Sequence, residues 1–187
     1  MTPAPRQLAL EIPHRPALGL EDFLVSQSND AAVALVDRWP DWPVRAAVIA
    51  GPAGSGKTHL ANVWRSKSGA ASIAAEAFDE AALAHLTAAR ALVVENLDRG
   101  VADQKALFHA LNLAREHKYS MLLTSRIAPG DLEIALPDLR SRLRALPHVA
   151  IEPPDEPLLH GLLVKLFADR QLAVEPALIG HLVRHME

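Results

Sequence analysis

A glycine-rich octapeptide at residues 51–58, GPAGSGKT, has the residue types and spacing of a phosphate-binding loop. It fits the pattern G-x-x-x-x-G-K-[ST] at every fixed position. Glycines let the backbone curl so that successive N–H groups point inward around an anion, Lys57 reaches the β- and γ-phosphates, and the Thr58 hydroxyl ligates Mg²⁺. An apolar run at residues 46–50 precedes the loop and a helical pattern follows it, which is the strand–loop–helix context that aims backbone dipoles at phosphate. We therefore predict a nucleotide-binding protein.

A second chemical signal stands where the apolar run at residues 91–94 ends in Glu95. A carboxylate at the C-terminal end of such a strand holds Mg²⁺, directly or through water. Aspartate is usual there, and Mg²⁺ tolerates little geometric error, so the longer glutamate can weaken metal binding. The next residue, Asn96, stands where ATPases of this layout typically have a carboxylate that polarises the attacking water, and a neutral amide cannot accept that proton. We expect Mg²⁺ at Thr58 and Glu95, with weak intrinsic hydrolysis.

Two further segments supply groups that could meet phosphate. The apolar run at residues 121–123 ends in Thr124 and Ser125, whose hydroxyls could contact a γ-phosphate or orient water. Residues 136–144, LPDLRSRLR, place arginines at alternate positions, so that on a helix Arg142 points away from the face shared by the other two. This segment is either a solvated basic helix or a guanidinium offered to phosphate on a neighbouring subunit.

The N-terminal 18 residues hold four prolines, which is too many for a helix or an interior strand. Between them Leu8, Leu10 and Ile12 alternate at strand period in a short run free of proline. Such a segment either docks into a groove of another protein or packs as an edge strand on its own domain.

Composition narrows the class of protein. The 187 residues are half hydrophobic, enough for a buried core, and the formal charge of −3 gives no basic field for nucleic acid or anionic lipid. There is no cysteine, and no apolar run approaches the ~20 residues needed to cross a bilayer. We expect a soluble, cytoplasmic protein with no membrane partner.

Hydrophobic periodicity predicts strands alternating with helices, hence a parallel sheet covered on both faces. We expect strands at residues 46–50, 71–77, 91–97, 121–124 and 148–152. We expect helices at residues 30–38, 58–64, 80–90, 103–118, 131–146, 156–170 and 176–186. Asn29 is the expected N-cap of the first helix, and Pro137 is expected to break the helical turns of residues 131–146. Pro153 and Pro154 mark a boundary before two terminal helices.

Taken together, residues 6–187 resemble the AAA+ ATPases of the bacterial replication initiator DnaA, and more closely its shorter homologue, the inactivator Hda. The resemblance lies in the segment at residues 20–29, Walker A at 51–58, Walker B at 92–96, sensor 1 at 122–125 and the arginine-finger box LPDLRSRL at 136–143. That box is much more specific to the family than Walker A. The N-terminal QLAL at residues 7–10 is similar to the Q-L-x-L sliding-clamp peptide of Hda, which favours the docking alternative.

The resemblance implies roles for individual residues. Those implied to bind ADP or ATP are Leu24, Val25, Gly51, Pro52, Ala53, Gly54, Ser55, Gly56, Lys57, Thr58 and His59. Those implied to act in hydrolysis are Glu95, Asn96, Ser125 and the arginine finger Arg142, and those implied to bind the clamp are Gln7, Leu8, Leu10 and Ile12.

Two departures from the DnaA pattern qualify the resemblance. DnaA has a C-terminal helix-turn-helix domain, and no residue after 187 is present to supply one, so we expect no direct sequence-specific DNA binding. The sensor 2 arginine would also lie beyond Glu187, so we expect an incomplete lid. The Glu95-Asn96 pair differs from a hydrolytic Asp-Asp or Asp-Glu, and Hda-like proteins also have a non-carboxylate second residue.

The expected architecture is a P-loop AAA+ αβα sandwich with a five-stranded parallel sheet, followed by part of an all-helical lid. Residues 1–18 are the clamp-binding segment, 19–152 the nucleotide-binding domain and 153–187 the start of the lid. The implied function is a regulator that binds the sliding clamp, stimulates hydrolysis of DnaA-bound ATP and restrains initiation. A homo-oligomer is a further partner that this resemblance allows. The alternatives are an autonomous ATPase such as a helicase loader, a more distant small-molecule P-loop kinase, and a nucleotide-held scaffold on the clamp.

Overall fold

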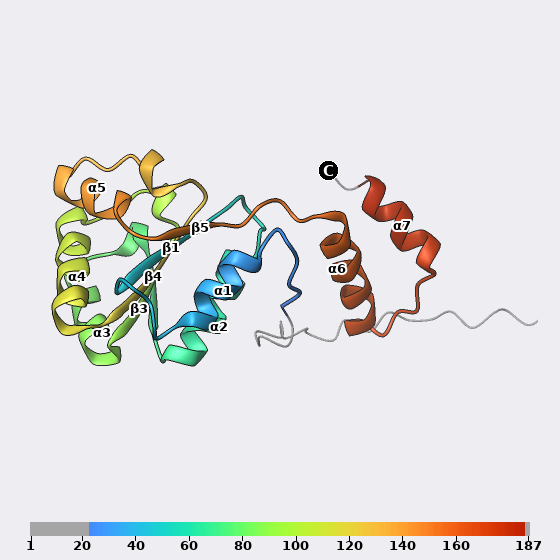
Figure 1. Cartoon of the computed structure of the whole chain (residues 1–187), viewed down its shortest axis with the longest axis horizontal. Helices are drawn as coiled ribbons and strands as arrows, with labels where there is room; N and C mark the ends of the chain where they lie inside the picture. Colours follow the sequence, from blue (N-terminus) through green and yellow to red (C-terminus); the bar gives the residue numbers. More distant parts are fainter. Residues whose placement is uncertain (1–22, 186–187) are drawn as a thin grey trace, which may run out of the picture.

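The computed structural model of the chain describes residues 23–185, and its centre is a five-stranded sheet (Figure 1). All neighbouring strands are parallel, in the order β2-β3-β4-β1-β5. The strands are β1 (Ala46–Ala50), β2 (Ala71–Ala74), β3 (Ala91–Glu95), β4 (Ser120–Ser125) and β5 (His148–Ala150). The predicted α/β fold with a five-stranded parallel sheet is therefore confirmed.

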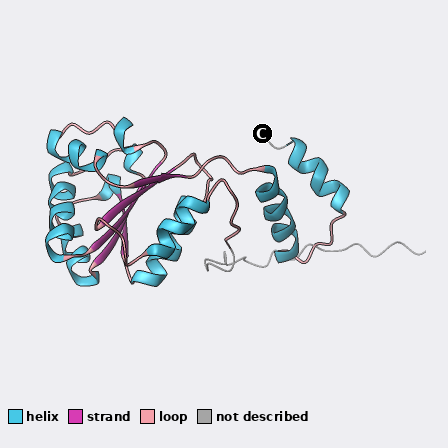
Figure 2. Cartoon of the chain, in the orientation of Figure 1, coloured by secondary structure: helices cyan, strands magenta, loops and turns pink. Residues whose placement is uncertain are grey.

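Helices cover both faces of this sheet (Figures 1 and 2). The α-helices are α1 (Asp30–Arg38), α2 (Lys57–Ser68), α3 (Ala81–Ala89), α4 (Gln104–His117), α5 (Pro137–Arg144), α6 (Glu156–Asp169) and α7 (Pro176–His185). The short 3₁₀ helices within residues 23–185 are η2 (Ala75–Ala77), η3 (Leu97–Arg99) and η4 (Pro129–Asp131).

Alternation along each strand divides the core into two layers, because successive side chains point to opposite faces of a sheet. Val48 of β1 packs with the layer under α3, α4 and α5, whereas its neighbour Ile49 packs with the layer under α1 and α2. β4 repeats the pattern, with Leu123 in the first layer and Leu122 in the second. Strands buried on both faces read as continuous apolar runs, which is why the sequence located them.

Some local predictions were wrong or only partly confirmed. Strands β2 and β3 end at Ala74 and Glu95, and the chain turns into η2 and η3 instead of extending to residues 77 and 97. Pro137 does not break a helix but starts α5 at its first position, where the missing N–H costs no hydrogen bond. Asn29 occupies the predicted N-cap position of α1, but its side chain makes no capping hydrogen bond to the helix. Its Oδ1 instead accepts from the Ser26 N–H, and its Nδ2 donates to the Leu24 carbonyl.

The three tryptophans of the chain form one group beside α2. Trp42 stacks on Trp64 with ring centroids 5.4 Å apart, and Trp39 meets Trp64 edge to face at 6.0 Å. The Trp39 indole N–H donates to the Ser120 hydroxyl, and that of Trp42 donates to the Leu35 carbonyl. The group joins α1, α2 and the chain between α1 and β1 to the start of β4.

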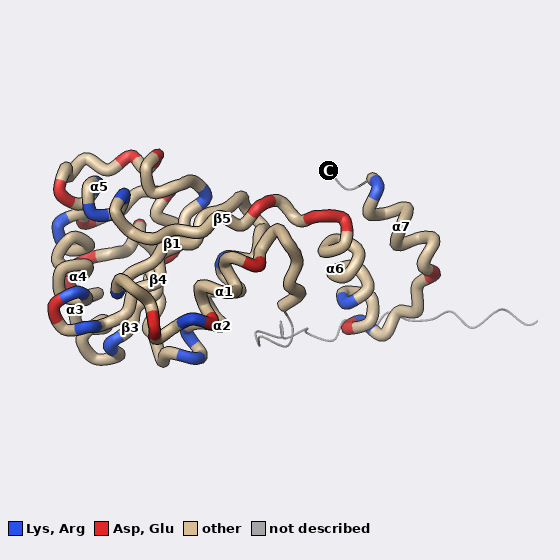
Figure 3. Tube along the Cα trace, in the orientation of Figure 1, with Lys and Arg blue, Asp and Glu red and all other residues tan. Residues whose placement is uncertain are grey.

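Helices α6 and α7 extend away from the sheet and pack on each other (Figure 1). Several of their large apolar side chains are exposed, among them Leu162, Leu166 and Leu178. Along the trace of the described residues, acidic and basic positions are interspersed over the sheet and its helices (Figure 3). Within residues 23–185, the helices are all too short or too polar to cross a membrane.

Candidate nucleotide-binding site

The glycine-rich loop runs from the end of β1 to the start of α2, as the sequence predicts. Gly51 has φ +157°, and a Cβ there would lie 2.7 Å from the Ile151 carbonyl oxygen. Gly56 has φ +92°, a left-handed conformation, and a Cβ there would lie 3.1 Å from the Phe23 ring. Glycine is therefore required at both positions by backbone conformation and by space. The loop ends at the N-terminus of a 12-residue helix, whose free N–H groups suit an anion.

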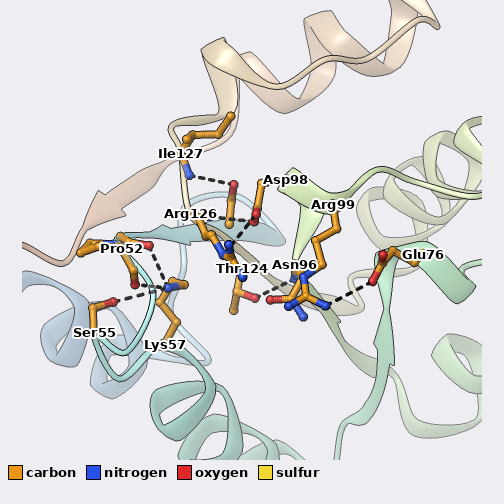
Figure 4. Close-up of polar contacts among 12 residues, drawn as sticks. Pro52, Ser55, Lys57, Glu76, Asn96, Asp98, Arg99, Thr124, Arg126 and Ile127 are labelled. Atoms are coloured by element: carbon orange, nitrogen blue, oxygen red, sulfur yellow. Dashed lines mark hydrogen bonds and ion pairs between the residues drawn. The ribbon is translucent and has the colours of Figure 1, made fainter.

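Lys57 is only 8% exposed and bends back over its own loop (Figure 4). Its ammonium group donates hydrogen bonds to the carbonyl oxygens of Gly51 at 2.8 Å and Pro52 at 2.6 Å. Burial lowers the pKa of the Lys57 ammonium, nearby Asp98 opposes that shift and nearby Arg126 adds to it. A polyphosphate would give this desolvated cation an anionic partner.

Thr58 and Glu95 lie next to each other at the C-terminal edge of the sheet. The Thr58 hydroxyl donates to Glu95 Oε2 at 3.3 Å, so the two expected Mg²⁺ ligands come from different elements and meet at one point. The Ser72 hydroxyl of β2 donates to Glu95 Oε1 at 2.8 Å. Ser72 thus holds the glutamate, a role that its position in the sequence did not reveal. A hydroxyl beside a carboxylate fits Mg²⁺, which prefers oxygen ligands.

Asn96 adopts a left-handed conformation with φ 61°, at the point where β3 gives way to η3. Asparagine tolerates this conformation better than most residues. Its backbone N–H donates to the Thr124 hydroxyl of the neighbouring strand at 3.1 Å. The backbone of Asn96 is therefore held at the end of β3, directly after Glu95. Its neutral amide stands where a hydrolytic site has a carboxylate to accept a proton.

Ser125, whose hydroxyl was expected to contact a γ-phosphate or to orient water, is fully buried at the end of β4. Its hydroxyl oxygen accepts from the Ile127 N–H at 3.2 Å, and its carbonyl accepts from the Gly51 N–H at 3.1 Å. The residue thus ties the end of β4 to the start of the phosphate-binding loop.

An apolar cavity of about 180 Å³ adjoins the phosphate-binding loop. It is lined by Phe23, Leu24, Ser28, Asn29, Gly54, Ser55, Gly56, His59, Ile151, Glu152, Pro154, Leu158 and Leu162. Leu24 and His59 were predicted to contact the nucleotide, and both belong to this wall. Val25, predicted with them, is 57% exposed and is not among the lining residues. The cavity's position beside a phosphate loop fits a nucleobase.

The cavity is lined by residues near the phosphate loop and by residues of helix α6. The Phe23 and His59 rings lie 5.1 Å apart, centroid to centroid, across one side of it. On the other side α6 contributes Leu158 and Leu162. A Cβ at Gly161 would lie 3.1 Å from Leu24 Cδ1, so this glycine allows close approach of α6 to the segment before α1. The sequence did not predict that α6 takes part, because its role depends on how the chain returns after β5.

Arg142 lies on α5, in the layer opposite to that of the phosphate-loop helix. Leu139 and Leu143 of α5 pack with α3 and α4, whereas Trp64 of α2 packs with α1. Arg142 is half-buried, and its Nη2 donates to Asn112 Oδ1 of α4 at 2.9 Å. Arg140 and Arg144 are exposed, so Arg142 does face differently, as the helical spacing predicted. The predicted clamp-binding residues 7–12 lie outside the described residues.

No protein-family model matches the sequence, and no curated protein matches it by sequence. Solved structures do resemble it. A DNA replication initiation factor matches with TM-score 0.79 at 20% identity, over 92% of this chain and 60% of that one. AMPPCP-bound DnaA from Aquifex aeolicus matches with TM-score 0.76 at 20% identity, over 92% of this chain and 62% of that one. Domain III of DnaA from Thermotoga maritima matches with TM-score 0.74 at 20% identity, over 92% of this chain and 82% of that one.

The fold is that of domain III of the replication initiation protein DnaA. The chain spans 60% and 62% of the length of the first two structures, so it corresponds to a part of those proteins. At 20% identity the likeness concerns the fold alone, and the assignment of a ligand depends on the phosphate loop and the residues around it.

Proposed function

We propose that this chain is a DnaA-like AAA+ regulator that binds adenine nucleotide with Mg²⁺, docks on the DNA polymerase sliding clamp and stimulates hydrolysis of ATP bound to DnaA. The observation that best supports this proposal is that Arg142 lies apart from the phosphate-binding residues, in the other helical layer of the sheet. The phosphate loop, Thr58 and Glu95 meet at one edge of the sheet, whereas Arg142 lies on α5 in the other layer. An arginine placed there suits the nucleotide site of an adjacent subunit.

The residues present support nucleotide binding and weak turnover. The glycine loop, the desolvated Lys57 and the Thr58–Glu95 pair form a phosphate and metal site. Asn96 follows Glu95 where a hydrolytic site needs a proton acceptor. The decisive experiment measures hydrolysis of labelled ATP preloaded on DnaA, with and without this protein and clamp loaded on DNA. Hydrolysis that does not rise when this protein is added contradicts the proposal.

A clamp-tethered scaffold that holds nucleotide without stimulating hydrolysis is the second candidate. One observation favours it: the Arg142 guanidinium is engaged by Asn112 of the same chain. Under this alternative the protein co-elutes with the clamp but leaves the rate of DnaA hydrolysis unchanged.

Replacing Gln7 and Leu8 together by alanine should remove most clamp binding. Burying one leucine contributes roughly 1.5–3 kcal/mol, so loss of this anchor weakens the complex about ten- to a hundredfold. Titration of the full-length variant against labelled clamp measures the effect, and a peptide of residues 5–13 should compete where a scrambled peptide does not. Unchanged clamp binding after deletion of residues 1–13 shows that the site is elsewhere.

The unaltered protein alone should hydrolyse ATP far more slowly than the ~1 s⁻¹ of an ordinary working enzyme. Asn96→Glu should raise this rate at least about tenfold, because a positioned general base contributes ~10²–10⁴-fold. Asn96→Ala is the matched control and should leave the slow rate unchanged. Phosphate release under single-turnover conditions measures all three, and a fast unaltered enzyme contradicts the assignment of Asn96.

A further inference from the structure

A carboxylate and a guanidinium that the predictions above do not use lie beside Lys57. Asp98 belongs to η3 just after β3, and Arg126 is the first residue after β4. The Arg126 N–H donates to Asp98 Oδ1 at 2.8 Å, and the Arg126 Nε lies 3.5 Å from Asp98 Oδ2. The Asp98 side chain is 10% exposed and that of Arg126 46% exposed. Figure 4 shows the pair at the same edge of the sheet as Lys57.

The sheet order places Arg126 near the phosphate loop. Strand β4 pairs with β1 on one side and β3 on the other, with Ala50 opposite Ser125. The Gly51 N–H donates to the Ser125 carbonyl, so the chain leaving β4 passes the first residue of the loop. In agreement with this placement, the Asp98 charge raises the pKa of the Lys57 ammonium and the Arg126 charge lowers it.

Two cationic side chains, Lys57 and Arg126, lie beside the phosphate loop, together with the Asp98 carboxylate. Like charges at short range repel, so Lys57 and Arg126 together favour an anion with more than one negative charge. The Arg126–Asp98 separation of 3.5 Å is longer than the roughly 2.7–2.9 Å of a close charge-assisted hydrogen bond. The guanidinium is half exposed, so it can turn toward a second anion while its backbone N–H stays on Asp98.

We propose that Arg126 binds the terminal phosphate of a nucleoside triphosphate held by this chain's own loop, and that Asp98 competes with that phosphate for the guanidinium. The proposal rests on nucleotide binding as put forward above and adds a discrimination between triphosphate and diphosphate. Because a diphosphate lacks the group that reaches Arg126, it leaves the arginine with Asp98. The chain thereby distinguishes its two adenine nucleotides through a residue next to the predicted sensor Ser125.

A matched control lies at the same edge of the sheet. Arg99 forms an ion pair with Glu76 at 3.7 Å, and both side chains are about half exposed. The charge separation in this pair and the exposure of its arginine are close to those of Arg126 and Asp98, but the pair stands on η3 and η2, away from the loop lysine (Figure 4). If only the loss of positive charge at this edge matters, Arg99→Ala and Arg126→Ala should weaken triphosphate binding equally. If Arg126 contacts the phosphate directly, only Arg126→Ala should weaken it.

The test measures dissociation constants of a non-hydrolysable ATP analogue and of ADP, with Mg²⁺, by titration of the full chain. Arg126→Ala should weaken binding of the triphosphate about 10- to 100-fold, the effect of losing a charged hydrogen-bonded contact, and change ADP binding less than about twofold. Arg99→Ala should change neither constant. Asp98→Asn keeps an acceptor oxygen for the Arg126 N–H, removes the competing charge and should strengthen triphosphate binding several-fold.

Equal changes for both nucleotides, or none, in Arg126→Ala overturn the proposal, and weaker triphosphate binding in Asp98→Asn overturns the competition. Thermal unfolding without nucleotide should be the same for Arg126→Ala and Arg99→Ala, which separates a folding defect from a binding defect. If the unaltered chain binds neither nucleotide, the proposed function itself fails. If it binds both and Arg126→Ala does not distinguish them, only this inference fails.

Discussion

Arg142→Ala should abolish stimulation of DnaA-bound ATP hydrolysis while nucleotide and clamp binding by this protein stay unchanged. A guanidinium supplied in trans offsets charge on the transferring phosphoryl group and contributes ~10³–10⁵-fold in rate. Arg142 lies on α5, in the layer opposite to this chain's own phosphate-loop helix, so its loss should leave that site intact. The measurement is hydrolysis of labelled ATP preloaded on DnaA, with clamp on DNA.

The same helix supplies the controls for this experiment. Arg140 and Arg144 are exposed, and Arg144 donates to the Gly130 carbonyl at 3.0 Å, so alanine at either position should cost little stimulation. Lysine at position 142 should rescue poorly, because it lacks the planar fork that engages two phosphate oxygens. If Arg142→Ala stimulates as well as the unaltered protein, the arginine finger is wrong and the scaffold becomes the better description.

Lys57→Ala should weaken adenine nucleotide binding by about two orders of magnitude or more. Each hydrogen bond to a charged group contributes about 1.5–3 kcal/mol, and this lysine is poised to exchange two loop carbonyls for phosphate oxygens. Titration with a fluorescent ATP analogue measures the loss. Since clamp docking is assigned to the N-terminal segment, co-elution with the clamp should persist without nucleotide if the two sites are independent.

Lys67 provides a matched lysine on the same helix. It lies in the last turn of α2 and pairs with Asp37 of α1 at 2.6 Å, away from the phosphate loop. Lys67→Ala removes the same charge and should leave nucleotide affinity within about twofold. Loss of the Lys67–Asp37 pair should also cost little folding stability, since partly exposed ion pairs contribute little to it. Similar losses for both variants indicate that the effect of Lys57→Ala comes from the net charge or from α2 itself.

Much of the fold could be predicted because the relevant signals are local. The runs at residues 46–50, 91–94 and 121–123, which lie in β1, β3 and β4, are apolar, as is typical of strands buried on both faces. Errors arose where a residue type has two uses. Proline at 137 reads as a helix breaker, but it is also the residue best suited to a first helical position. Asn29 reads as a cap, but its amide bonds the segment before the helix instead.

For the site, a motif located the loop, and tertiary structure supplied the rest. The phosphate-loop and strand-end motifs assigned Thr58 and Glu95 to one Mg²⁺ site, and the structure brings the two together although β4 lies between β1 and β3. Ser72 and Asp98 were missed because a lone serine in a strand and an aspartate in a short turn carry no spacing signal. Their roles depend on strand order, which places β2 beside β3 and β4 beside β1. A single sequence does not state that order.

The grouping of all three tryptophans beside α2 has a consequence for spectroscopy. Intrinsic emission from this protein originates in one place, where Trp39 and Trp42 each lie within 6.0 Å of Trp64 by ring centroid. Fluorescence melting curves therefore report the unfolding of the layer of α1 and α2. They do not report the unfolding of α6 and α7, which contain no tryptophan. Circular dichroism registers every helix. A difference between the transition temperatures from fluorescence and from circular dichroism would show that the terminal helices melt separately, without any added label.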